Sequence, residues 1–147
     1  MQIKNQIIKL TTKETLEFID ITDKIQSKIK EANIKNGLIN IQTLHTTTAV
    51  IVNEAEPLLI EDMKNLLNKL APQNYNYQHD NFEIRTVNMC DGECANGHAH
   101  NKAIHLPTSV LLNIVNNELQ LGTWQRIFFI ELDRSRQRQI ALQIMGK

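Results

Sequence analysis

The stretch "GHAHNKAIH", residues 97–105, holds three of the five histidines of the chain. Neutral imidazole binds transition metals such as zinc, and histidine also transfers protons near neutral pH. In an extended segment His98 and His100 would project to the same side, and His79 would approach from the preceding polar region. This spacing predicts a divalent metal site, with zinc as the first candidate and His45 as a further ligand. The alternative is a set of ordinary surface histidines.

Two carboxylates upstream have a spacing that suits acid–base chemistry. Glu54 and Asp62 lie eight positions apart, close to two helical turns, so both could face one pocket as general bases or support a metal. The alternative is that Glu54 only favours a helix N-terminus and that Asp62 is solvated. Asn53 is a further catalytic candidate, with helix capping as its alternative.

Three other side chains are candidates for substrate binding. Thr46 offers a hydroxyl at a strand junction, and Arg138 offers two parallel donors that match a phosphate. Trp124, the single tryptophan, could stack on a heterocycle. The alternatives are β-propensity for the threonine and a place in the core or a subunit interface for the tryptophan.

The segment "CDGEC" could be interpreted with His98 and His100 as a zinc knuckle. Cys90 and Cys94 are separated by three residues, however, whereas structural zinc sites usually use two or four. Two reduced thiols in a cytosolic loop are the favoured interpretation.

Length and charge limit the function classes. A chain of 147 residues is the size of one domain, so residues 1–147 are expected to form a single unit. Sixteen basic and sixteen acidic residues cancel, which argues against nucleic acid or an anionic membrane as a partner. The N-terminal segment lacks the features of a signal peptide, and no apolar run approaches the roughly 20 residues of a membrane-spanning helix, which predicts a cytoplasmic protein.

Hydrophobic periodicity predicts the elements that must position these side chains. An N-terminal pair of strands reads as a hairpin, two helices and two internal strands follow, and a long polar loop precedes the histidines. The expected ranges are a hairpin over 2–10 and 15–20, a helix over 23–34, strands over 38–45 and 47–53, a helix over 56–70, a loop over 71–97, and strands over 107–115 and 125–132 before the closing "RQIALQIM". Asn116 and Asn117 are expected to form a turn with positive φ, and the long apolar strands over 107–115 and 125–132 are expected to be edge strands. The order predicts an α+β fold, with β-sandwich-like mixed sheets and two helices.

Several of these motifs together resemble one known family. The segments are "HTTTAVIVNEAEPLLIEDM", "YQHD", "GHAHNKA", "LGTWQRIFFIELDRSRQRQI" and the closing "MG". In this order and over nearly the whole chain they are similar to the YjbQ-like family, whose members are called secondary thiamine-phosphate synthases.

The resemblance implies an α+β sandwich-like domain that assembles as a homotrimer. The polar residues of the family correspond to His45, Asn53, Glu54, Asp62, His79, Asp80, His100, Trp124 and Arg138. His105 and the "CDGEC" loop depart from the family pattern.

The activity that the family name implies joins a hydroxymethylpyrimidine diphosphate to a thiazole phosphate and releases pyrophosphate. The expected function is therefore metal-assisted transfer on a small phosphorylated heterocyclic substrate, which the resemblance implies as a side activity of the family. The alternative is a non-catalytic trimer that binds a metal or a metabolite. Convergence of the histidines and carboxylates on one accessible pocket would favour the enzyme.

Overall fold

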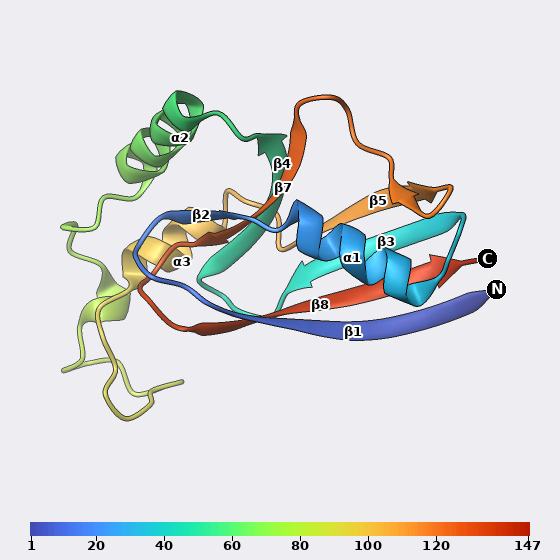
Figure 1. Ribbon diagram of the computed structural model, residues 1–147. Helices are drawn as coiled ribbons and strands as arrows, with labels where there is room; N and C mark the ends of the chain where they lie inside the picture. Colours follow the sequence, from blue (N-terminus) through green and yellow to red (C-terminus); the bar gives the residue numbers. More distant parts are fainter.

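A computed structural model describes residues 1–147 as two antiparallel sheets with three α-helices (Figure 1). The five-stranded sheet has the order β1-β8-β3-β5-β6, and the three-stranded sheet has the order β2-β7-β4. The elements are β1 (Gln2–Thr11), β2 (Glu17–Asp20), α1 (Thr22–Ala32), β3 (Gly37–Thr43), β4 (Thr48–Glu54), α2 (Pro57–Leu70), the 3₁₀ turn η1 (Gln78–Asp80), α3 (Gly97–Ala103), β5 (Ser109–Val115), β6 (Glu118–Leu119), β7 (Gln125–Glu131) and β8 (Gln137–Gly146). The α+β fold predicted from the sequence is confirmed.

The layers follow from the alternation of side chains along β7, the central strand of the smaller sheet. Ile127 and Phe129 join the core formed with α1 and the five-stranded sheet. Phe128 and Ile130 join a second core on the other face, where Leu67 of α2 and Ala99 of α3 contribute. Since successive strand residues point to opposite faces, β7 is buried on both sides and holds the two cores together.

Helix α1 covers the inner face of the larger sheet, in front of β3 and β8 in Figure 1. Its apolar stripe is Ile25 and Ile29, both fully buried, and Asn33 ends it in the left-handed conformation. The predicted helix over 23–34 is thus confirmed. It begins one residue earlier and ends two residues earlier than expected.

The predicted N-terminal hairpin is wrong. β1 pairs with β8 over its whole length, whereas β2 pairs with β7 in the other sheet. Leu16, at a φ of 55°, lies where the chain crosses between the sheets. Local apolar patterns identify strands but not their partners, and here both partners lie more than a hundred residues away.

In the C-terminal half the predicted turn is confirmed, whereas the predicted edge strands are not. Asn116 and Asn117 both adopt positive φ in the turn between β5 and β6, as expected. The strands predicted over 107–115 and 125–132 were expected to be edges, but β5 lies between β3 and β6, and β7 lies between β2 and β4. Both sheets are antiparallel throughout, where mixed sheets were expected.

The histidine cluster forms a short helix rather than an extended segment. α3 spans Gly97–Ala103, so His98 and His100 lie about 200° apart around its axis. The Oδ1 atom of Asp80 accepts hydrogen bonds from the backbone N–H groups of Asn96 at 2.9 Å and Gly97 at 2.8 Å. These bonds satisfy the free donors at the start of α3. None of the helices is long and apolar enough to span a membrane.

Candidate functional site

One cavity gathers several of the predicted side chains with arginines that were not predicted. It has a volume of about 490 Å³ and lies where the β3–β4 turn, the loop before α3 and the start of β8 meet. We call it the histidine–arginine cavity, and its lining residues are Leu44, His45, Thr46, Thr47, His79, Arg85, Asn88, Cys90, Glu93, Asn96, His100, Arg136 and Arg138.

His79 and His100 form the histidine pair of this cavity. Their rings are in edge contact, with centroids 4.6 Å apart. Burial and the neighbouring His79 lower the pKa of His100, so this imidazole is mainly neutral at pH 7. The Nε2 atom of His79 is buried and has no partner in the protein. The hydrogen bonds from Asp80 to the start of α3 hold the two segments that carry these histidines together.

His45 extends the β-ladder beyond the end of β3. Its Nε2 atom accepts a hydrogen bond of 2.8 Å from the backbone N–H of Gln139 on β8. Burial and the positive charge of Arg138 lower the pKa of His45, which also favours the neutral ring. A neutral ring that accepts at Nε2 carries its proton on Nδ1, so His45 offers a donor to a ligand.

Arg138 is fixed by a buried ion pair. Its Nε and Nη2 atoms donate to the two carboxylate oxygens of Glu131, both at 2.6 Å, and Nη2 also reaches Thr47 at 3.2 Å. Thr12 donates a further hydrogen bond to Glu131 at 2.9 Å. The arginine predicted as a phosphate ligand lines the cavity, but its charge is already balanced by Glu131.

Arg85 and Arg136 supply the more available positive charge. Arg136 lies 3.3 Å from the buried carboxylate of Asp133, and a third of its side chain is exposed. Arg85 donates to the backbone carbonyls of His79 and Asn88, and its nearest carboxylate, Glu93, is 3.8 Å away. Three guanidinium groups and one carboxylate, Glu93, line the cavity. Because Arg138 is balanced by Glu131, Arg85 and Arg136 are the groups available to an anion.

The structure does not bring the predicted carboxylates into this cavity. His45 precedes β4 and Glu54 ends it, so the two lie at opposite ends of a strand roughly 20 Å long. Asn53, Glu54 and Asp62 are all exposed, and Asp62 lies on the outer surface of α2. The helical spacing of Glu54 and Asp62 does not apply, because α2 begins only at Pro57.

The expected capping role of Asn53 is also wrong. The cap of α2 is Glu56, whose side chain accepts from the backbone N–H groups of Leu58 and Leu59. Asn53 instead contacts Met63 and its own neighbour Glu54.

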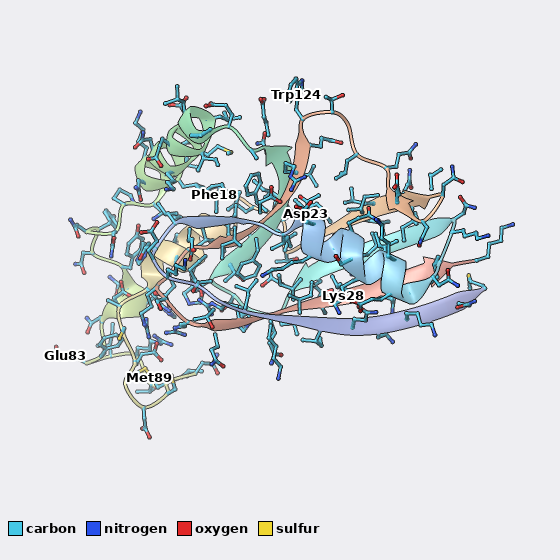
Figure 2. The ribbon with its side chains drawn as sticks, in the orientation of Figure 1. Phe18, Asp23, Lys28, Glu83, Met89 and Trp124 are labelled. Carbon is cyan, nitrogen blue, oxygen red and sulfur yellow. The ribbon has the colours of Figure 1, made fainter.

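Trp124 lies outside the cavity as well. Its side chain is 71 % exposed on the turn before β7, so it is not a core residue. Figure 2 shows it at the opposite end of the molecule from Met89, which belongs to the loop bordering the cavity.

Four residues of the "GHAHNKAIH" segment, Gly97, His98, Ala99 and Lys102, are buried instead of lining an open pocket. His98 is 3 % exposed and does not line the cavity. Lys102 is fully buried and donates to the carbonyl of Ala71 at 2.6 Å. Ala99 is fully buried in the second core. Gly97 serves close packing, because a Cβ there would lie 2.5 Å from Tyr77.

The predicted metal ligands are only partly brought together. No group of three or more His, Cys, Asp or Glu side chains of the chain is placed to hold one metal ion. His79 and His100 adjoin, His45 uses Nε2 for Gln139, and His98 points elsewhere. Cys90 and Cys94 are exposed and form no disulfide bond.

The protein is thus an antiparallel α+β sandwich with a cavity lined by arginines and histidines at one end of its strands. Residues 6–147 match the family described as UPF0047 protein YjbQ-like, and the chain belongs to this family. A UPF0047 protein of Methanothermobacter thermautotrophicus is 33 % identical over 147 residues, which cover all of this chain and 95 % of the relative. A UPF0047 protein of Archaeoglobus fulgidus is 36 % identical over 94 % of this chain and 98 % of its own length.

Solved structures agree with this assignment. A YbjQ-like protein of unknown function from Sulfolobus solfataricus superimposes with a TM-score of 0.88 at 29 % identity, covering 99 % of both chains. A hypothetical protein from Aeropyrum pernix gives a TM-score of 0.85 at 32 % identity, covering 98 % of this chain and 99 % of its own.

Proposed function

We propose that the histidine–arginine cavity binds a diphosphate ester and that the protein is a transferase of the secondary thiamine-phosphate synthase type. The supporting observation is the gathering of Arg85, Arg136 and Arg138 with neutral imidazoles around one cavity. Guanidinium groups match phosphate oxygens in geometry and charge, and a partly enclosed site strengthens such contacts.

Glu54 and Asp62, whose convergence with the histidines was expected of an enzyme, do not line the cavity. The proposed reaction nevertheless suits this site, because it needs no carboxylate as a general base. The bond between the methylene carbon of the pyrimidine and the diphosphate oxygen breaks, and its electron pair leaves with pyrophosphate. The thiazole nitrogen donates its lone pair to that carbon and carries no proton that must be removed. The main requirement is therefore stabilisation of the departing diphosphate, which positive charge and hydrogen-bond donors provide.

Individual residues have distinct parts in this proposal. Arg136 and Arg85 neutralise the diphosphate, while Arg138 holds the wall of the cavity through Glu131. The Nδ1–H group of His45 donates to a phosphate oxygen, and Thr46 supplies a hydroxyl at the rim. The neutral ring of His100 donates a hydrogen bond to the leaving group.

A divalent cation, with zinc as the first candidate, would bind at His79 and His100. The unpartnered Nε2 of His79 and the adjoining ring of His100 fit two nitrogen ligands of such an ion. When bound, the cation would add positive charge next to the diphosphate. Further ligands would have to come from the substrate or from another subunit.

The proposed homotrimer is supported by apolar side chains on the outer face of the five-stranded sheet. Ile3, Ile7 and Leu111 are each at least half exposed there. An exposed apolar sheet face favours burial against another subunit. Light scattering should give three times the chain mass of 16.9 kDa, and a mass of one chain would contradict the trimer.

The function is tested by measuring pyrophosphate release from the pyrimidine diphosphate and thiazole phosphate. We expect His100→Ala to lower kcat by about 10²-fold or more, the usual effect of removing one transition-state donor. His105→Ala is the matched control, because His105 is exposed and outside the cavity. Wild-type protein that binds these compounds without releasing pyrophosphate would instead be the non-catalytic metabolite-binding protein.

A further inference from the structure

A second cavity adjoins the histidine–arginine cavity at the ends of β1 and β8. It has a volume of about 570 Å³. We call it the Lys9 cavity, and its lining residues are Lys9, Leu10, Thr11, His45, Gln137, Arg138 and Gln139. His45 and Arg138 line both cavities, so the two spaces are neighbours.

The strand register explains why this cavity is polar. Lys9 lies opposite Gln139 in the ladder, and Thr11 lies opposite Gln137. Alternate residues of paired strands share one face, so these four side chains project together from the outer face of the sheet. The inward-facing residue between them on β1 is the apolar Leu10, which packs against the main core.

His45 and Arg138 are engaged within the protein, whereas the side chains of the other four polar lining residues, Lys9, Thr11, Gln137 and Gln139, are not. Lys9 takes part in none of the ion pairs of the chain, and no carboxylate lines the cavity. Gln139 enters the hydrogen bonds of the protein only through its backbone N–H, which binds His45. An ammonium group, a hydroxyl and two amides without an acidic neighbour are suited to an anion that carries few charges.

We propose that the Lys9 cavity binds the phosphate monoester of the second substrate, which in the proposed function is the thiazole phosphate. This inference rests on the proposed function, because a transfer reaction needs two occupied sites that adjoin. Lys9 binds the phosphate, and the hydroxyl of Thr11 and the amides of Gln137 and Gln139 donate to it. His45, between the two cavities, faces both substrates and separates their phosphate groups.

Calorimetric titration of the full chain with thiazole phosphate, and separately with pyrimidine diphosphate, tests this assignment. We expect Lys9→Ala to weaken binding of thiazole phosphate about tenfold, as loss of one charged hydrogen bond does, and to leave pyrimidine diphosphate binding unchanged. Lys4→Ala is the matched control, since Lys4 lies on the same strand, is exposed and lines neither cavity. In turnover, Lys9→Ala should raise the KM for thiazole phosphate while kcat stays constant.

Three outcomes would overturn the proposal. They are thiazole phosphate binding that is equal in Lys9→Ala and wild type, loss of pyrimidine diphosphate binding instead, and a wild-type protein that binds no thiazole phosphate. The proposed function fails separately: if binding depends on Lys9 but no pyrophosphate is released, the second cavity stands and the coupling reaction does not. A thermal melt checks that each variant is folded. Because Lys9 is exposed, its replacement should leave the melting temperature unchanged.

Discussion

Replacement of Arg138 by methionine should strongly destabilise the protein, because it leaves the carboxylate of Glu131 buried without its positive partner. The two side chains are 4 % and 0 % exposed, and two hydrogen bonds of 2.6 Å join them. After the substitution Glu131 keeps only the hydroxyl of Thr12 and the backbone N–H of Asp133. Breaking a buried pair in this way costs about 3–5 kcal/mol of the free energy of unfolding.

Urea unfolding at fixed protein concentration measures this loss, since the stability of an oligomer depends on concentration. Arg126→Met is the matched control. Arg126 also pairs at 2.6 Å, with Asp20, but both side chains are about a third exposed, so its loss should cost no more than about 1 kcal/mol. Replacing Arg138 and Glu131 together by apolar residues should recover part of the stability. Equal losses in Arg138→Met and Arg126→Met would refute the reasoning.

Three further predictions concern the histidines, the Asp80 contact and the cysteines. Burial lowers the pKa of His45, His98 and His100 below the 6.5 of a free histidine. As the pH falls from 7 to 5, the unfolded chain therefore takes up protons before the folded chain does, and the free energy of unfolding should fall. A melting temperature that rises as the pH falls over this range would contradict the prediction. Asp80→Ala removes the acceptor for two N–H groups of α3 and should cost about 1–3 kcal/mol and weaken pyrophosphate binding, whereas exposed Glu83→Ala should change neither. Changing exposed Cys90 and Cys94 to serine should alter stability by no more than about 0.5 kcal/mol and leave zinc content unchanged; a drop in bound zinc would restore the knuckle interpretation.

The elements with a strong local period were predictable from the sequence. The apolar stripes of α1 and α2 and the β-branched residues of β3 and β4 identify these elements within a few positions. The short helix α3 was not predictable in this way, because glycine, histidine and asparagine have low helix propensity. Contacts distant in sequence determine its structure, chiefly the Asp80 hydrogen bonds and the packing of Ala99 in the second core.

The candidate site was predictable only in part for the same reason. His45, His79, His100, Thr46 and Arg138 were named from the sequence and line one cavity. Arg85 and Arg136 were missed, because the fold of the polar loop and the start of β8 bring them there. The "RSRQR" run was the available signal, but spacing alone does not show which arginine faces the cavity.

The placement of Glu54 and Asp62 shows how a strand separates residues that look adjacent. His45 and Asn53 are only eight positions apart, yet β4 carries the chain from one end of the smaller sheet to the other between them. Strand direction and pairing decide at which end of the sheet a connection between two elements lies. Local sequence patterns determine neither.

A crystal structure with bound pyrophosphate tests the central claim most directly, because it locates the anion without depending on turnover. The account predicts density in the histidine–arginine cavity within hydrogen-bond distance of Arg136, Arg85 and Nδ1 of His45. Pyrophosphate bound beside Glu54, Asp62 or Trp124 would contradict it, as would a cavity that stays free of pyrophosphate at saturating concentration.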